Sequence, residues 1–232
     1  DPLLILAVLL LVGMGLPAVY SATYNIAQSL GDPLYFVKRQ ALWVLLGLGC
    51  AAVVVRFDYR DLAGWSHVAY LFCLVLLVLV LRWGPEIGGA SRWLVLGPVQ
   101  LQPAELAKLA VILSLARQLD ARPPDSWGRV LAALLWVVPP AGLIVLQPDL
   151  GTATIFFGIV FGMLFFAGAP GRILAALLAM LAGLAALIVW GSLGGWLPLL
   201  KDYQLARLMV FIDPYRFAHQ EGWNVIQSMI AI

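Results

Sequence analysis

A short polar segment, "GGASRWLVLGPVQLQPAELAK" at residues 88–108, lies between two long apolar stretches. Within it, Arg92 directly precedes Trp93. At a membrane boundary, a guanidinium can hold a phosphate through parallel hydrogen bonds, and the phosphates available there belong to lipid headgroups or lipid-linked diphosphates. Simple lipid anchoring uses the same contact, and tryptophan is common at bilayer boundaries. Arg92 is therefore a candidate phosphate ligand, and membrane anchoring is the alternative for both residues.

The end of this segment, "LQPAELAK", predicts the start of a helix. Pro103 follows Gln102, and a proline in the first turn costs no backbone hydrogen bond because that N–H would be unpaired anyway. Glu105 and Lys108 then lie three residues apart on one helix face, where they can form an ion pair. The pair either anchors the helix at the membrane surface or faces a polar cavity, because charges in a membrane helix usually avoid lipid.

A second Gln-Pro sequence, "QPDLGTATIF", begins at residue 147. Asp149 precedes Thr152 by three residues, the spacing at which a carboxylate caps the N-terminus of a helix. As a functional group, Asp149 could orient a substrate hydroxyl, pair with Arg92 or Lys108, or help to hold a divalent cation. The residue types leave both the capping role and these functional roles open.

Composition predicts the elements that must position these side chains. Of the 232 residues, 63% are hydrophobic and only 11% are charged, and long apolar runs recur along the chain. We predict an all-α, polytopic integral membrane protein that forms one domain over 1–232, with about seven spans for a bilayer core of ~30 Å. The predicted spans are Leu3 to about Thr23, 40–55, 66–81, 104–116, 130–146, 151–167 and 172–190.

The number of spans decides which connections share one side of the membrane. One side is predicted to hold the loops at 24–39, 82–103 and 147–150 and the tail at 191–232. Arginines are concentrated in the opposite connections, at 56–65 and 117–129, which favours that side as cytoplasmic. The polar motifs then face outward, and the tail belongs to a large extracytoplasmic loop in which 203–212 predicts an amphipathic helix.

Several classes of protein and site lack support in the sequence. A net charge of +2, distributed among the loops, gives no basis for nucleic-acid binding. Cys50 and Cys73 lie in apolar runs and indicate neither a disulfide nor a metal site. The chain has no P-loop, no paired-histidine metal motif and no serine-hydrolase elbow, and we predict no organic cofactor.

Five motifs, in order, resemble the SEDS family of shape, elongation, division and sporulation proteins, which includes the RodA, FtsW and SpoVE types. The motifs are "YSAT", "FVKRQ", "GASRWLVLGPVQLQPAELAKLAVIL", "QPDLGTATIFF" with "FFAGAP", and "RLMVFIDPY" followed by "EGWNVIQSMIAI". The resemblance covers essentially the whole chain. The last motif is more similar to the RodA elongation branch than to the FtsW division branch.

The resemblance implies a peptidoglycan glycosyltransferase of the bacterial cytoplasmic (inner) membrane. Such an enzyme polymerises lipid II outside the membrane for cell elongation and shape, releases undecaprenyl diphosphate, and works with a class B penicillin-binding protein that crosslinks the strands. A divalent cation, Mg or Mn, is the expected cofactor, without known ligands, and membrane lipid is an expected partner.

The resemblance also implies a central cavity. By position in the motifs, the side chains carried over to it are those of Arg92, Trp93, Gln102, Glu105, Lys108, Asp149 and Thr152. Among them, Arg92 and Lys108 are the candidates for contact with the diphosphate. Asp149 is the candidate for an electrostatic or metal-supporting role.

The family pattern extends beyond this sequence. Members have about ten membrane helices, against about seven predicted here from apolar length. The aspartate usually regarded as catalytic, in a segment resembling "HTDFIF", follows the last motif. Because the sequence stops at Ile232 and begins without methionine, we expect a C-terminally truncated portion of a longer chain, inactive by itself.

Two other functions are compatible with the same residues. A lipid II flippase would also need cations in a membrane cavity, and Pro139-Pro140 could mark a broken helix of the kind that transporters use. A kink beside a cavity explains these prolines equally well, so they do not separate the two functions. A non-catalytic scaffold of the cell-wall machinery would need surface contacts instead of Arg92, Lys108 and Asp149. Product chemistry separates the three functions, because only the enzyme makes glycan polymer.

Overall fold

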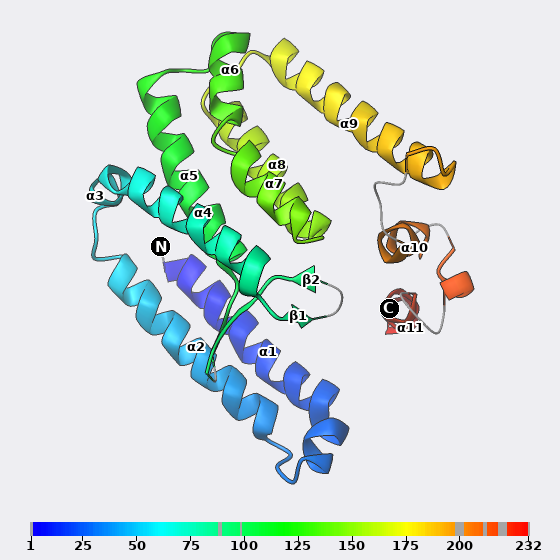
Figure 1. Cartoon of the computed structure of the whole chain (residues 1–232). Coiled ribbons are helices and arrows are strands. Elements are labelled where there is room, and N and C mark those ends of the chain that lie inside the picture. The colour runs from blue at the N-terminus through cyan, green and yellow to red at the C-terminus, as the bar shows by residue number, and fades with distance from the viewer. Residues whose placement is uncertain are drawn as a thin grey trace. The chain divides into compact units, whose positions relative to one another are not determined.

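The computed structural model describes residues 2–87, 90–97, 99–197, 202–210, 213–217 and 222–231, which are mainly helical (Figure 1). Contacts within the chain define two compact units, Asp1–Ser66 and His67–Ile232. The glycines at 88 and 89, parts of the predicted loop at 191–232 and residues 211 and 212 of the predicted helix at 203–212 lie outside the described residues.

Four described helices are long and apolar enough to cross a membrane, which confirms the predicted polytopic α-helical class. They are α1 (Pro2–Ser29), α2 (Tyr35–Val54), α4 (Ser66–Trp83) and α9 (Gly171–Leu193). A bent pair, α6 (Trp127–Leu134) and α7 (Val138–Leu146), makes a fifth candidate span, and α8 (Leu150–Phe166) is apolar but shorter. The predicted number of about seven spans is not confirmed by this count.

The first unit is built on the antiparallel pair of α1 and α2, followed by the short α3 (Tyr59–Gly64). Gly31 begins the turn between the long helices with a φ of +84°, in the left-handed region that glycine enters without strain. Asp32 Oδ1 accepts a hydrogen bond from the Leu34 N–H at 3.0 Å, and Asp32 Oδ2 pairs with Lys38 Nζ at 2.8 Å. The turn is therefore closed by an exposed carboxylate.

The second unit has a core to which α4, α5 (Pro103–Ala121), α7 and α8 each contribute fully buried side chains. Leu77, Leu115, Ile144 and Phe156 are all 0% exposed. Lipid tails are as apolar as these side chains, so close packing, more than removal from water, holds membrane helices together. This packing fixes where the ends of α5 and α8, which carry the predicted site residues, stand in the unit.

The segment predicted as one span at 130–146 forms two helices, α6 and α7, with a bend of 42° between them. Pro139 and Pro140 lie in the first turn of α7 and have no N–H groups to donate to the carbonyls of Leu135 and Trp136, four residues earlier. The helix consequently breaks at 135–137. The sequence had indicated the prolines as a break, and the structure confirms it.

Two small antiparallel hairpins occupy the connection between α4 and α5, where the sequence predicted only an irregular loop (Figure 1). In the first, β1 (Glu86–Ile87) pairs with β2 (Ala90–Ser91). In the second, β3 (Leu94–Leu96) pairs with β4 (Val99–Leu101) around Gly97, whose φ is +63°. The hairpins give Arg92 and Trp93 a defined place between β2 and β3.

The described parts of the C-terminal region contain short helices only. They are α10 (Asp202–Val210), the 3-10 turn η1 (Tyr215–Phe217) and α11 (Trp223–Ala231). Within the described residues, α10 confirms the helical piece predicted at 203–212. The predicted placement of this region outside the cell stays a prediction.

Candidate functional site

Asp149 and Thr152 form the N-terminal cap of α8, as their spacing predicts. Asp149 Oδ1 accepts a hydrogen bond from the Thr152 N–H at 3.2 Å, and Asp149 Oδ2 accepts one from Thr152 Oγ1 at 2.8 Å. The aspartate is only 8% exposed. The side chain of Asp149 therefore satisfies a backbone N–H in the first turn of α8.

Arg92 reaches this cap from a distant part of the sequence. Its Nη2 donates to the Pro148 carbonyl at 3.1 Å, and its Nε lies 3.5 Å from Asp149 Oδ2. The buried Nε makes no hydrogen bond, so its contact with Asp149 is an ion pair without a hydrogen bond. The arginine side chain is 26% exposed and the aspartate side chain 10%. A covered carboxylate thus holds a guanidinium that an outside ligand can still reach.

Gln147 is a positioning residue that the sequence prediction missed. Its side-chain Nε2 donates to the Leu77 carbonyl of α4 at 3.0 Å, and the residue is 2% exposed. This hydrogen bond joins the end of α7, just before α8, to α4. The second Gln-Pro sequence was the available signal, but nothing in it indicated that the glutamine side chain is buried.

Gly84 is a second residue that the sequence prediction missed. It lies just after α4, and a Cβ added there would stand 2.5 Å from the Val80 carbonyl oxygen and 3.3 Å from that of Trp93. The contact with Val80 is too close for any Cβ, so the backbone can leave α4 in this way only with glycine, and the contact with Trp93 would also be tight. Trp93 itself is half-buried, and its predicted role as a ligand stays a prediction.

Glu105 and Lys108 form the predicted i,i+3 ion pair in the first turns of α5, with 2.8 Å between Oε2 and Nζ. The glutamate side chain is 56% exposed and the lysine side chain 20%. Gln102 occupies the N-cap position of α5, but its side chain makes no capping hydrogen bond. Among the described residues, no hydrogen bond or ion pair joins this pair to Arg92 and Asp149, so the structure brings together two groups and not one.

The described residues offer few ligands for a divalent cation. They contain no cluster of three His, Cys, Asp or Glu side chains. Both oxygens of Asp149 already accept hydrogen bonds from Thr152, and the neighbouring guanidinium of Arg92 repels a cation. This donor set by itself does not fit a divalent ion.

Comparisons with known proteins give a consistent result. The chain is 36% identical over 99% of its length to "Probable peptidoglycan glycosyltransferase FtsW" of Thioalkalivibrio sulfidiphilus, and covers 56% of that protein. It is 32% identical over its whole length to "Peptidoglycan glycosyltransferase MrdB" of Escherichia coli, of which it covers 59%. The chain therefore spans little more than half the length of these curated relatives.

A solved structure and a family profile extend this similarity. The structure, described as "Structural coordination of polymerization and crosslinking by a peptidoglycan synthase complex", contains a chain with 39% identity and a TM-score of 0.72. The match covers 95% of the present chain and 64% of that one. The profile of the FtsW/RodA/SpoVE family, described as cell cycle proteins, matches residues 2–232. The chain belongs to the FtsW/RodA/SpoVE family of integral membrane proteins.

Proposed function

We propose that the protein containing this chain is a peptidoglycan glycosyltransferase that polymerises lipid II at the outer face of the bacterial inner membrane. The observation that carries the proposal is the partly exposed Arg92 held by the covered Asp149 at the head of α8. A fixed guanidinium at this place suits the diphosphate of a lipid-linked donor. The names of the relatives support the same reaction class.

In this reaction, a sugar hydroxyl of one strand attacks the anomeric carbon of the donor sugar. The new glycosidic bond forms as the bond from that carbon to the diphosphate breaks. The hydroxyl gives its proton to a general base other than Asp149, and undecaprenyl diphosphate leaves with the electron pair of the broken bond. We assign Arg92 and Lys108 to binding this diphosphate, because cations placed where charge develops lower the barrier. Trp93, Gln102 and Glu105 complete the proposed cavity wall.

Asp149 is assigned a positioning role in this proposal. Its two oxygens are engaged by Thr152 and Arg92, so it is poorly placed to take the proton of the attacking hydroxyl. Its charge instead keeps Arg92 oriented and compensates the guanidinium when no substrate is bound. Thr152 fixes the carboxylate in turn.

The test is polymerisation of labelled lipid II by the purified full-length protein together with its transpeptidase partner. We expect glycan ladders from the parent protein and loss of long products from Arg92→Ala. Retention of normal ladders by a folded Arg92→Ala protein would contradict the assigned role of this residue. Transport of intact lipid II across proteoliposomes, without any glycan, would replace the enzyme by a flippase.

Three finer parts of the proposal have their own measurements. A class B penicillin-binding protein is proposed as partner, and co-purification tests it. The predicted divalent cation is tested by polymerisation with a chelator and then with Mg or Mn restored. The elongation role is tested by complementation, because rescue of cells depleted of their elongation enzyme separates it from a division role, and relatives of both branches are similar to the chain.

The outward orientation of the motif side is proposed from the arginine distribution. Val95 in β3 is 47% exposed and suits a reporter cysteine. In a protein whose Cys50 and Cys73 are replaced by alanine, we expect Val95→Cys to react with a membrane-impermeant maleimide added outside. Labelling only from the cytoplasm would reverse the orientation.

A further inference from the structure

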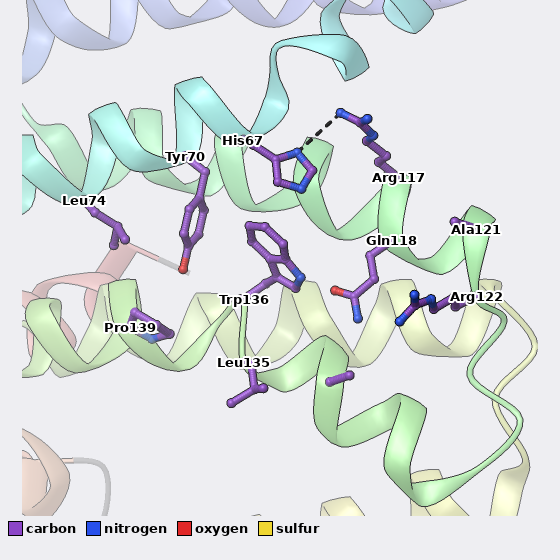
Figure 2. Close-up of a pocket in the computed structure, with 11 residues that line it drawn as sticks. His67, Tyr70, Leu74, Arg117, Gln118, Ala121, Arg122, Leu135, Trp136 and Pro139 are labelled. Atoms are coloured by element: carbon purple, nitrogen blue, oxygen red, sulfur yellow. Dashed lines mark hydrogen bonds between the residues drawn. The ribbon is translucent and has the colours of Figure 1, made fainter.

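A cavity of about 690 Å³ lies in the second unit at the last turn of α5, beside the break between α6 and α7 (Figure 2). Its polar and aromatic lining comes from His67, Tyr70, Arg117, Gln118, Arg122 and Trp136. Lys108 and Arg117 are nine residues apart on α5, about 14 Å along the helix axis, so this cavity lies toward the other end of the helix from the Glu105–Lys108 pair. It is not used by the proposed reaction.

The polar end of the cavity carries two cations and one buried acceptor. Arg117 Nη1 lies 3.4 Å from His67 Nδ1, and Arg122 is exposed just after α5. Gln118 projects between them from the same helix, and its buried Oε1 has no hydrogen-bond partner among the described residues (Figure 2). A buried acceptor without a donor costs free energy unless a ligand supplies the donor.

Trp136 forms the aromatic wall of this cavity. Its ring meets the rings of His67 and Tyr70 edge to face, with centroid distances of 4.9 Å to each. Trp136 stands in the break at 135–137, so the same prolines that interrupt the helix present this ring to the cavity. Amphipathic rings of this kind favour the level of lipid headgroups.

An apolar groove of about 620 Å³ continues from the polar cavity between α4 and α7. The two share Leu74 and Pro139 in their linings. The rest of the groove is hydrocarbon and glycine, including Val78, Gly142 and Leu146. The nine residues of α7 span about 13 Å, close to one leaflet of a ~30 Å hydrocarbon core. A cationic pocket thus opens into a groove of acyl-chain length.

We propose that these two cavities form one binding site for an anionic glycerophospholipid of the adjacent leaflet. Arg117 and Arg122 attract its phosphate, and Gln118 Oε1 accepts a hydrogen bond from a headgroup hydroxyl, as phosphatidylglycerol provides. One acyl chain follows the groove between α4 and α7. Basic pockets between membrane helices are known to bind anionic headgroups, and each cation near the surface strengthens such binding. The headgroup hydroxyls of phosphatidylglycerol supply the donor that Gln118 Oε1 lacks, which favours the glycerophospholipid over a polyprenyl phosphate.

The headgroup end is tested by native mass spectrometry of the detergent-solubilised protein after exposure to phosphatidylglycerol. We expect Arg117→Gln combined with Arg122→Gln to lower lipid retention by about fivefold for each arginine. Gln118→Leu, which keeps the charges, should lower it several-fold. Arg172→Gln is the matched control. It also removes one positive charge, but Arg172 is an exposed residue at the start of α9 that lines neither cavity.

The groove is tested by Gly142→Phe, which fills it from within. A Cβ at Gly142 meets nothing within 4 Å, so the variant should fold. We expect it to lower phosphatidylglycerol retention severalfold, and we expect the control Gly128→Phe in α6, which is equally open and lines neither cavity, to leave it unchanged.

Three results would overturn the proposal. One is equal retention of phosphatidylglycerol by the parent and by all pocket variants. The second is equal retention of zwitterionic phosphatidylcholine, because the arginines would then not select a charge. The third is preferential retention of undecaprenyl phosphate at this site, which would assign it to a polyprenyl lipid. If the double variant does not fold, Arg122→Gln alone, at an exposed position, replaces it with an expected loss of about fivefold.

Discussion

The two Gln-Pro sequences of the chain are similar, but their side chains make different contacts. At the start of α5, the Gln102 side chain makes no capping bond, and the acidic residue that follows is paired within its own helix and half exposed. In the second sequence, Gln147 at the end of α7 is buried against α4, and Asp149 is covered and paired with Arg92 from the segment between the two hairpins. The same local motif therefore forms a candidate site only where other elements cover it.

The largest effect on polymerisation is expected at Asp149, where two substitutions separate the charge of the side chain from its capping role. Asp149→Ala removes both, and the lost cap should cost about 0.5–2 kcal/mol of stability. Asp149→Asn keeps a side-chain acceptor for the Thr152 N–H but loses the charge that holds Arg92. If the proposed function holds, we expect both variants to polymerise lipid II about 100-fold more slowly.

The two variants differ in stability, which a thermal unfolding midpoint in detergent reports. Asp149→Asn should unfold close to the parent protein, whereas Asp149→Ala should unfold earlier. Parent-like polymerisation by Asp149→Asn would show that capping is the whole role of the residue and would remove the functional difference between the two Gln-Pro sequences.

The next effect compares the two glutamines directly. Gln147→Leu removes a buried hydrogen bond to the Leu77 carbonyl, which keeps its donor within α4, and should cost about 0.5–1.5 kcal/mol. Gln102→Leu removes a side chain that makes no capping bond, and should change stability by no more than about 0.5 kcal/mol. Chemical denaturation of both variants checks the difference. Equal losses would mean that the buried hydrogen bond to α4 contributes nothing.

The ion pair of α5 should contribute less than the hydrogen bond of Gln147. Glu105→Gln removes a pair whose glutamate is more than half exposed, and i,i+3 pairs contribute only about 0.2–0.5 kcal/mol. We expect unfolding midpoints nearly equal to the parent at high salt, because salt screens exposed charges. A loss above about 1 kcal/mol would place this pair in a covered environment like that of Asp149.

The smallest effect is expected at Asp32, an exposed carboxylate that also closes a helix connection. The hydrogen bond from Lys38 and that from the Leu34 N–H lower the pKa of Asp32 below its ordinary value of 3.8. The resulting stabilisation is present above that ordinary value and is lost as the pH falls through the lowered pKa. Unfolding midpoints of the parent and Asp32→Asn should therefore differ slightly near neutral pH and converge in acid. A constant difference would exclude this titration as the cause.

Local features of the site were predictable because short spacings fix them. A helix places residues three apart on one face, so the Glu105–Lys108 pair and the cap of Thr152 by Asp149 followed from sequence. The start of α5 was predictable from Pro103, because a proline in the first turn of a helix costs no backbone hydrogen bond. The prolines at 139 and 140 likewise indicated the break before α7.

Other features depend on elements that meet only in the folded chain. The hydrogen bond from Gln147 to Leu77 joins residues 70 positions apart. The hairpins were not predicted, because two or three residues per strand are too few for an alternating pattern to be recognised. Gly84 gave no signal either, since its close neighbours belong partly to the Trp93 segment.

The sequence by itself determined the membrane class, the family motifs, most helix boundaries and the contacts between residues three or four apart. These depend on hydrophobic length and on helix geometry, which act locally. Only the tertiary structure decided that Arg92 meets Asp149, that Gln147 is buried and that a cationic pocket opens into an apolar groove. Such contacts join distant segments, and their geometry is set by the packing of whole helices against one another.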